Sequence, residues 1–321
     1  MPTPQIAVLP DKKLLPSKKP VSGEPVSAPV GGDRSPEAKG IENLIRAASK
    51  KNKTPFMIIR KSQLVKQCQR FRKALPQVMP FYAIKANPHP KIIKTFIQLG
   101  CGFDVASAAE MRLVLDLGAK PEKIIFANTI KSVEDIVAAR RARVRLMTVD
   151  SEPELYKIAD NYPRAHVILR IKVDNDQSVV NLSLKFGADA DMAFPLIQKA
   201  KSLGLTPVGI SFHVGSQSFN VENYTRALEI TRNIFTEAKE NNIQLKIVDI
   251  GGGFPIPHFD SETSINFEKM AAQIDKKINQ VFDPSVTFIA EPGRFFAGPA
   301  GILVTQVVGR SFRNNKNYYY F

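Results

Sequence analysis

The sequence predicts an α/β protein built around a (β/α)8 barrel of the TIM type, and three observations support this fold class. From about Ser62 onward, short apolar segments rich in Ile, Val and Leu alternate with longer segments of helical pattern. Such alternation is typical of parallel βαβ units joined by right-handed crossovers. Eight strands fit into roughly 230 residues, close to the ~250 that such a barrel usually needs. A doubly wound open sheet is the alternative fold.

Each βα unit has its own sequence signals. The strands are expected at 79–85, 103–105, 123–127, 145–149, 166–173, 207–213, 245–250 and 286–290. The helices are expected at 64–75, 92–99, 108–117, after 132, 151–160, 192–203, 221–241 and 265–282. Two helices begin with a predicted capping box, Ser107 with Glu110 and Ser132 with Asp135, in which side chains satisfy the first free amides.

The barrel is flanked by segments of different composition. Residues 1–40 are rich in Pro, Lys and Ser and are expected to form a disordered tail, because they cannot bury enough apolar surface to offset their ordering entropy. Residues 41–61 are expected to hold a lead-in helix and, at 56–59, the first strand of a β-domain. The barrel is expected at 62–296, and residues 297–321 are expected to begin a C-terminal β-domain.

The composition is that of a globular protein with a sizeable core. The 321 residues are 44% hydrophobic and 23% charged. No apolar run approaches the ~20 residues that span a membrane, and no compact apolar block resembles a secretory signal. Two cysteines, Cys68 and Cys101, cannot build a disulfide framework and lack metal-ligand spacing. We therefore expect a cytoplasmic protein whose cysteines are reduced.

The net charge of +15 raises the question of a nucleic-acid partner. The basic residues are spread along the chain rather than gathered with aromatic residues. The densest run, residues 140–145, follows a predicted helix, where cations suit the helix dipole. The sequence therefore favours a protein that binds neither nucleic acid nor membrane.

The apolar strand within residues 80–87 ends in Lys85. Pro88 and Pro90 follow it and stop the strand, because proline has no N–H to donate. A lysine held at the carboxyl end of a buried strand can have its pKa lowered and act as an amine nucleophile, as in Schiff-base chemistry. A lysine that extends its amine into solvent is the alternative interpretation.

The other strand ends carry residues that also suit chemistry. In an α/β barrel, functional residues lie at the carboxyl ends of the strands. In chain order these ends hold Lys85, Asp104, Asn128, Asp150, Arg170, His213, the glycines 251–253 and Glu291. A lysine, an arginine, a histidine, a glycine triplet and a glutamate at one edge of a barrel indicate an active site.

The loops after the last two strands suggest a phosphate site. The glycine triplet at 251–253 can surround an anion with backbone N–H groups, and Arg294 is a natural bidentate phosphate donor. Barrels often bind phosphate with these two loops. An ordinary flexible turn is the alternative for the triplet. A dinucleotide fingerprint would need Gly-x-Gly-x-x-Gly and a later acidic residue, a pattern that the sequence does not meet here.

The remaining groups complete a match to pyridoxal phosphate. His213 could stack on a planar ring and Ser216 could reach a phosphate, although a structural histidine is the alternative. A buried Glu291 needs a cationic partner, and a pyridinium nitrogen would provide one. The aldehyde, ring, ring nitrogen and phosphate of this cofactor each find a suitable partner, and no metal is expected.

Six segments then carry a resemblance to a known family, namely 80–87, 102–107, 184–187, 211–216, 249–255 and 290–294. In this order they resemble the barrel motifs of the ornithine decarboxylase family. These are pyridoxal-phosphate enzymes of the alanine-racemase-like fold, and they include lysine/ornithine, diaminopimelate and arginine decarboxylases. The resemblance extends from about Thr54 to the end of the chain.

The resemblance implies a role for each matching residue. The implied catalytic residues are Lys85, which would bind the aldehyde, His213, which would stack on the ring, and Glu291, which would keep the ring nitrogen protonated. The implied cofactor-binding set is Lys85, Asp104, Arg170, His213, Ser216, Gly252, Gly253, Glu291 and Arg294. Glu110 matches an acidic family position, where capping is the alternative role.

The resemblance also implies an activity. The chain would be a PLP-dependent carboxy-lyase that converts ornithine or lysine, a small-molecule amino acid, to a diamine in polyamine biosynthesis, with putrescine as the product from ornithine. Diaminopimelate and arginine decarboxylases are alternatives, although residues 294–296 resemble the ornithine branch. A non-catalytic regulator that resembles antizyme inhibitors is an alternative of another class, but such relatives tend to lose cofactor residues that this chain keeps.

The sequence departs from the family at its end. In the family a C-terminal β-domain follows the barrel and supplies the partner subunit's share of the active site. That share is a cysteine-aspartate-glycine motif, a substrate-binding aspartate and a tyrosine that binds the phosphate. This chain ends at Phe321, where that domain would be starting, and neither Cys68 nor Cys101 matches the family cysteine. We therefore expect a truncated chain that is inactive alone, and a homodimer for the full-length form.

Overall fold

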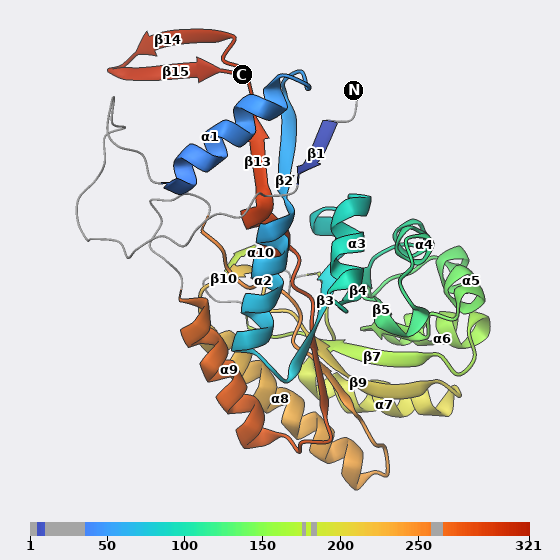
Figure 1. Ribbon diagram of the computed structural model, residues 1–321. Helices are drawn as coiled ribbons and strands as arrows, with labels where there is room; N and C mark the ends of the chain where they lie inside the picture. The colour runs from blue at the N-terminus through green and yellow to red at the C-terminus, as the bar shows by residue number, and fades with distance from the viewer. Residues whose placement is uncertain (1–4, 10–35, 175–177, 181–184, 258–265) are drawn as a thin grey trace. The chain divides into compact units, whose positions relative to one another are not determined.

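The computed structural model describes residues 5–9, 36–174, 178–180, 185–257 and 266–321 (Figure 1). The chain forms two compact units. One unit contains Met1–Gln63 together with Ala300–Phe321, and the other contains Leu64–Pro299. The second unit holds every strand-end residue that the sequence singled out.

The second unit is a closed barrel of parallel strands. Around the barrel the strands follow chain order, and β12 closes the ring by pairing with β3. This confirms the predicted (β/α)8 barrel, and the open-sheet alternative is wrong. The strands are β3 (Val78–Ala83), β4 (Gly102–Val105), β5 (Ile124–Phe126), β6 (Leu146–Val149), β7 (His166–Ile171), β9 (Thr206–Phe212), β11 (Ile247–Asp249) and β12 (Thr287–Ala290).

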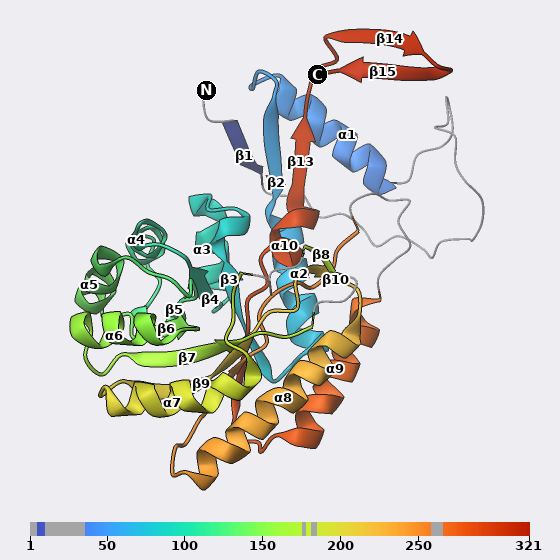
Figure 2. The same ribbon diagram turned by 180° about the vertical axis from the view of Figure 1, so that it is seen from behind.

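Helices surround these strands. Helices α4 to α9 contact one another in chain order, and Figure 2 shows α7, α8 and α9 side by side on one flank. The helices are α2 (Lys61–Ala74), α3 (Pro90–Gln98), α4 (Ala108–Asp116), α5 (Val133–Ala142), α6 (Glu152–Asn161), α7 (Ala193–Ser202), α8 (Val221–Glu240), α9 (Phe267–Val281) and α10 (Arg294–Ala297). A short antiparallel pair, β8 (Ser178–Val180) with β10 (Ser216–Ser218), lies outside the ring.

The core of the barrel unit has two layers, one inside the ring of strands and one between the strands and the helices. Inside the barrel, Phe81, Ile125, Ile168 and Ile289 pack together from four different strands. Branched and aromatic side chains pointing inward fill such a barrel, so its interior is a packed core rather than a pore. The predicted apolar strands therefore bury one face against the barrel interior and the other against the helices.

An aromatic cluster packs α2 against the last segments of the barrel unit. The ring of Phe71 lies 5.2–6.1 Å from the rings of Phe254, Phe267, Phe295 and Phe296, measured between centroids. Three of the four contacts are edge-on, an arrangement that aromatic quadrupoles favour. The cluster joins α2, α9, α10 and the loop after β11, and so holds the loops that follow the last two strands.

Both predicted N-cap serines cap their helices, but the carboxylates of the predicted boxes accept from other amides. The Ser107 hydroxyl accepts a hydrogen bond from the Glu110 amide at 3.2 Å, and the Ser132 hydroxyl accepts one from the Asp135 amide at 3.0 Å. The Glu110 carboxylate accepts from the Ala106 amide at 2.6 Å. The capping residues thus set where α4 and α5 begin, directly after the strand-end loops.

The other unit is built around strand β2 (Phe56–Arg60). It pairs in parallel with β1 (Gln5–Leu9) and antiparallel with β13 (Gly301–Val304). Helix α1 (Pro36–Ser49) packs on this sheet through Ala48, which belongs to a small core with Phe56, Ile58 and Val304. The predicted tail, residues 1–40, thus contains β1 and the start of α1, and its other residues lie outside the described part.

The chain ends in a β-hairpin, β14 (Gly309–Arg313) and β15 (Lys316–Tyr320). Two residues, Asn314 and Asn315, connect the strands, with φ of 52° and 58°. A two-residue hairpin turn of this kind needs two left-handed residues, and asparagine tolerates that conformation better than most.

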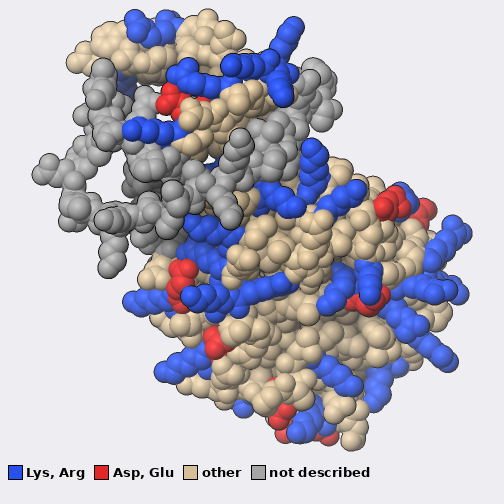
Figure 3. Space-filling model, viewed as in Figure 1, with Lys and Arg blue, Asp and Glu red and all other residues tan. Residues whose placement is uncertain are grey.

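On the face shown in Figure 3, Lys and Arg side chains lie scattered over the described residues, with fewer Asp and Glu between them. None of the helices in the described ranges has the length and apolar character that crossing a bilayer requires.

Candidate active site

Lys85 follows strand β3 in a short 3-10 turn, Ile84–Ala86. The strand ends at Ala83, two residues before the lysine, so Lys85 stands just beyond the end of the strand rather than on it. Its Nζ lies 3.3 Å from Oδ2 of Asp104, which is 2% exposed, whereas the Lys85 side chain is 63% exposed. The register explains the contact, because Ala83 pairs with Asp104 on the neighbouring strand. The amine is therefore held by one carboxylate and remains open to a ligand.

The expected lowering of the Lys85 pKa is wrong for this structure. The negative charge of Asp104 raises the pKa of Lys85, and burial opposes this effect less strongly. Glu291 adds to the rise and Arg170 reduces it. Lys85 is therefore an ammonium at neutral pH and must give up a proton before it can attack an aldehyde.

Asp249 and Glu291 form a coupled acidic pair. Burial raises the pKa of Asp249 to about 7, and burial followed by the charge of Asp249 raises the pKa of Glu291 well above its ordinary value. The amide of Gly251 donates to Asp249 Oδ1 at 2.8 Å. A negative charge on Asp249 disfavours ionisation of Glu291, and a hydrogen bond between the two side chains favours the ionised form of Asp249, so the pair tends to hold one proton.

His213 follows strand β9 and is neutral. Burial, the charge of Arg170 and the charge of Lys85 lower the pKa of His213 to about 3. Its Nδ1 accepts a hydrogen bond from the Gly215 amide at 3.0 Å, so the hydrogen of the neutral ring is on Nε2. A fixed, uncharged imidazole presents a flat face that suits stacking on an aromatic ring.

The glycine triplet has no room for side chains. A Cβ on Gly252 would lie 2.7 Å from the Glu291 carbonyl oxygen and 3.3 Å from His213 Nε2. Gly251 and Gly253 have φ of +65° and +93°, and their Cβ atoms would overlap the carbonyl oxygens of Phe212 and Gly215. The absence of Cβ atoms lets this backbone pack directly on the loops that carry His213, Ser216 and Glu291.

Arg170 lies at the same level as Asp249. In the parallel register, Arg170 pairs with Ser211, and Ser211 pairs with Asp249. The guanidinium stands 5.2 Å from the ring centroid of Phe186, within cation–π range. The predicted motif at 184–187 therefore supports Arg170, although Leu184 itself lies outside the described residues.

The remaining predicted phosphate ligands, Ser216 and Arg294, follow strands β9 and β12. Ser216 is half-buried at the start of β10, and Arg294 is exposed at the start of α10. A Cβ on Gly293 would lie 3.1 Å and 3.2 Å from the Cβ atoms of Ala86 and Ala83. The loop before Arg294 therefore packs on the turn that carries Lys85.

Two other strand-end residues, and Glu110 of α4, hold backbone groups. Asp150 accepts a hydrogen bond from the Gly187 amide at 3.0 Å, and Asn128 donates to the Ala106 carbonyl at 3.5 Å. Glu110 caps α4 through the Ala106 amide. These contacts position the loops, and no cluster of His, Cys, Asp and Glu suited to a metal occurs among the described residues.

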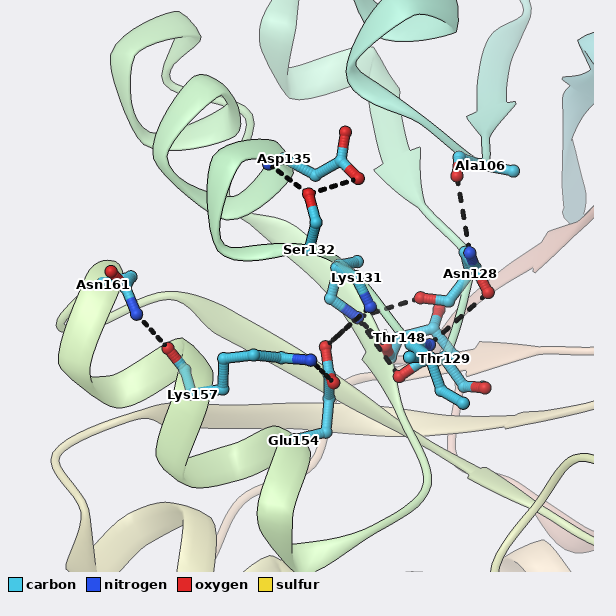
Figure 4. A network of polar contacts seen from close by, with 11 residues as sticks. Ala106, Asn128, Thr129, Lys131, Ser132, Asp135, Thr148, Glu154, Lys157 and Asn161 are labelled. Carbon is cyan, nitrogen blue, oxygen red and sulfur yellow. Dashed lines mark hydrogen bonds and ion pairs between the residues drawn. The ribbon is translucent and has the colours of Figure 1, made fainter.

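Sequence reasoning missed a buried ionic network at the same edge of the barrel (Figure 4). Lys131 Nζ donates to the carbonyl oxygens of Asn128, Thr129 and Thr148 at 2.9, 3.4 and 2.7 Å, and lies 3.1 Å from Glu154 Oε1. Lys157 reaches the other oxygen of Glu154 at 2.7 Å. The side chains of Lys131 and Glu154 are 0% and 2% exposed, so the network closes the ends of β5 and β6.

Tyr224 was also missed. Its hydroxyl donates to the Gly252 carbonyl at 2.8 Å, and its ring stacks on Phe254. This fully buried tyrosine of α8 thus anchors the glycine triplet from outside the barrel. An aromatic residue in a helix carries no sequence signal for such a role, whereas Asp249 could have been suspected from its place at a strand end.

Comparisons with known proteins agree with this geometry. Residues 61–298 match the family model described as "Pyridoxal-dependent decarboxylase, pyridoxal binding domain". The chain belongs to the pyridoxal-dependent decarboxylase family. A lysine/ornithine decarboxylase from Selenomonas ruminantium is 38% identical over 278 residues, which cover 87% of this chain and 70% of that protein.

Two further relatives of this chain have different names, one an antizyme inhibitor and the other an arginine decarboxylase. Antizyme inhibitor 2 from Xenopus laevis is 38% identical over 273 residues, which cover 84% of this chain and 59% of that protein. The crystal structure of the Paramecium bursaria Chlorella virus arginine decarboxylase has a TM-score of 0.80 and 35% identity, and the match covers 88% of this chain and 75% of that chain. The chain spans between 58% and 70% of the length of four curated relatives.

The cofactor of this family domain is pyridoxal phosphate, as the sequence predicted. The residues present fit it. The Ser211 hydroxyl is buried without a hydrogen-bond partner among the described residues, and the carboxyl groups of Asp249 and Glu291 at the same barrel edge both have raised pKa values because they are buried. A pyridinium N–H is a charged donor of the kind that such an acidic pair needs.

Proposed function

We propose that this chain is the cofactor-binding barrel of a decarboxylase that acts on a basic amino acid, ornithine or lysine. One observation supports this above the others. The amine of Lys85, held by Asp104, shares one barrel edge with the proton-sharing pair Asp249–Glu291 and with a neutral His213. An amine for the aldehyde, an acid pair for the ring nitrogen and a flat face for the ring are the groups that this cofactor requires.

In this proposal, Lys85 binds the aldehyde, His213 stacks on the ring and Glu291 holds the ring nitrogen. The proposed phosphate ligands are Ser216, Gly252, Gly253 and Arg294, from the loops that the glycine triplet brings together. Asp104 and Arg170 orient the lysine and the acidic pair. When bound, pyridoxal phosphate supplies an electron-accepting ring that stabilises the negative charge left when carbon dioxide departs.

Asp104 has a positioning role in this proposal. Its Oδ2 lies 3.3 Å from Lys85 Nζ, and its side chain is buried. Asp104 therefore holds the amine at the barrel edge, and the amine gives up its proton before it attacks.

Covalent capture of the cofactor tests the lysine assignment. The purified chain is mixed with pyridoxal phosphate, reduced with borohydride and mapped by peptide mass spectrometry. We expect a pyridoxyl group on Lys85 and none in Lys85→Arg. Lys91→Arg is the matched control, because Lys91 is exposed in the neighbouring helix and should leave the label unchanged. Stoichiometric labelling of a different lysine would contradict the assignment.

Substrate choice is tested separately by release of labelled carbon dioxide from ornithine, lysine, arginine and diaminopimelate. We propose that ornithine or lysine is preferred. A regulatory role like that of antizyme inhibitors remains the second candidate, since the Xenopus protein is as similar as the bacterial enzyme. Stoichiometric label on Lys85 without turnover of any of the four amino acids, in the full-length homodimer that we also propose, would favour the regulator.

A further inference from the structure

The two cysteines of the chain lie in contact. Their Sγ atoms are 3.5 Å apart, although Cys68 and Cys101 are 33 residues apart in sequence. Cys68 belongs to α2, and Cys101 immediately precedes β4. The residues are 1% and 3% exposed, and both are free thiols. Nothing in the proposed decarboxylase chemistry uses this pair.

Rigid backbone motifs fix both cysteines. Cys68 lies on the buried face of α2, one turn from Leu64 and Phe71. Cys101 closes the end of α3, where its amide donates to the Phe96 carbonyl at 3.0 Å and Gly100 has φ of +69°. Hydrogen bonds of this pattern are a standard helix end with a left-handed glycine. The approach of the two sulfurs is therefore set by the main chain rather than by a chance rotamer.

The two sulfurs are not equivalent. The hydrogen bond with Cys101 lowers the pKa of Cys68, burial opposes this effect, and the charge of Arg72 adds to the lowering. The same hydrogen bond and burial raise the pKa of Cys101. The half-buried Arg72, on the next turn after Cys68, also points Nη2 toward Cys101 Sγ at 3.8 Å. The opposite directions of the two shifts favour Cys68 as the attacking sulfur and Cys101 as the resolving one.

We propose that Cys68 and Cys101 form an oxidation site at which a hydroperoxide produces an intramolecular disulfide. The Cys68 thiolate attacks one peroxide oxygen, the O–O bond breaks, and the leaving oxygen takes a proton to become water or an alcohol. Cys68 is then a sulfenic acid. The Cys101 sulfur attacks Sγ of Cys68, an S–S bond forms, and the sulfenic oxygen leaves as water with the Cys101 proton. The two sulfurs are oxidised and the peroxide is reduced.

The geometry favours this reaction over cross-linking between chains. The sulfurs need to close from 3.5 Å to about 2.05 Å, which side-chain rotation and small shifts of α2 can supply. A bond there would close a loop from 68 to 101 that contains β3 and Lys85. Closing a loop restricts the unfolded chain, so the oxidised protein should be more stable than the reduced one.

The test uses the chain with its two native cysteines. Purified folded protein is treated with hydrogen peroxide, and free thiols are then counted in denaturant. We expect both thiols of the sequence to disappear, the mass to fall by two hydrogens, and a single peptide pair linked through Cys68 and Cys101. A thiol reductant should restore both thiols, and the thermal midpoint should be higher for the oxidised form.

Single variants test the order of attack. In Cys101→Ser the reaction should stop at a sulfenic acid on Cys68, which dimedone traps, and in Cys68→Ser the remaining Cys101 should resist peroxide. Three results would overturn the proposal: two thiols that persist in the folded parent protein, a disulfide that joins separate chains, or a Cys68–Cys101 bond that forms only in denaturant. None of these results depends on cofactor binding or on decarboxylation.

Discussion

Two lysines stand at the same edge of the barrel, and their surroundings give them opposite properties. Lys131 has no exposed surface and four oxygen partners, and burial lowers its pKa to about 8. Lys85 is 63% exposed, has one carboxylate partner, and has a raised pKa. A search for a perturbed, lowered lysine pKa would select Lys131.

The geometry instead favours Lys85 as the lysine proposed to bind the aldehyde. Each of the three hydrogens of the Lys131 ammonium is already directed at an oxygen, so the amine is held and has no path to a ligand. Lys85 keeps donors and space on the side away from Asp104. The comparison indicates a structural role for Lys131, whose donors are all satisfied, and agrees with the proposed role of Lys85, whose set of partners is incomplete.

Removal of Lys131 is expected to have the largest effect on stability. Lys131→Met leaves Glu154 buried with the residue-131 amide and the half-exposed Lys157 as partners, and it frees three carbonyl groups. We expect a loss of about 3–5 kcal/mol in the free energy of unfolding, measured by urea denaturation. Lys157→Met, which removes the more exposed partner of the same carboxylate, should cost about 1 kcal/mol or less. Equal effects of the two changes would contradict the structural role of Lys131.

The substitution Glu291→Gln tests the proposed active site around Lys85. The amide cannot share a proton with Asp249 or carry a negative charge toward a ring nitrogen. Decarboxylation by the assembled enzyme should fall by roughly 100-fold or more, since a preorganised charge at the reacting group is lost. The borohydride label on Lys85 should persist. Glu110→Gln, at a helix cap, is the control, and a Glu291→Gln rate within a few-fold of the parent would exclude the proposed role.

The acidic pair predicts a pH dependence of stability. Asp249 has its pKa raised from 3.8 to about 7 in the folded chain, so the folded state retains a proton that the unfolded state loses. The contribution of Asp249 to the free energy of unfolding should therefore fall as the pH rises from about 4 to about 7. Asp249→Asn cannot ionise, so the parent should lose stability relative to this variant across that range, in denaturation curves of the cofactor-free chain. Parallel pH profiles of the two proteins would contradict the raised pKa of Asp249.

The smallest effect concerns the helix that starts beside Lys131. Ser132 caps α5 through the Asp135 amide. Ser132→Ala should cost about 1 kcal/mol in unfolding free energy, the usual value of a lost N-cap. The loss should be clearly smaller than that of Lys131→Met, because the buried ammonium rather than the cap holds the loop. A cap variant as destabilising as Lys131→Met would reverse this ranking.

Much of the fold and of the candidate site is predictable because the barrel turns sequence order into spatial order. Once eight strands are recognised, their carboxyl ends must meet at one edge, and Lys85, Asp104, His213 and Glu291 come together without further information. The N-cap serines are local signals and are equally predictable. The assignment of roles to these residues stays a prediction, since it depends on a bound cofactor.

What the sequence did not predict depends on contacts between distant residues. Lys131 and Glu154 each look like ordinary surface residues, and only the meeting of β5 and β6 buries them together. The pKa of Lys85 was predicted in the wrong direction because the prediction weighed burial and not the neighbouring Asp104. The contact between Cys68 and Cys101 requires the relative placement of α2 and α3, which no local pattern specifies.

The glycine triplet has a consequence for how mutational data on this protein should be interpreted. Each missing side chain leaves room for a carbonyl oxygen of another loop, from Phe212, Gly215 or Glu291. An alanine scan would therefore score these positions as intolerant even if they touched no ligand. Libraries that aim to change substrate preference gain nothing by varying residues 251–253, because a low score at the triplet does not separate backbone crowding from the proposed phosphate contacts.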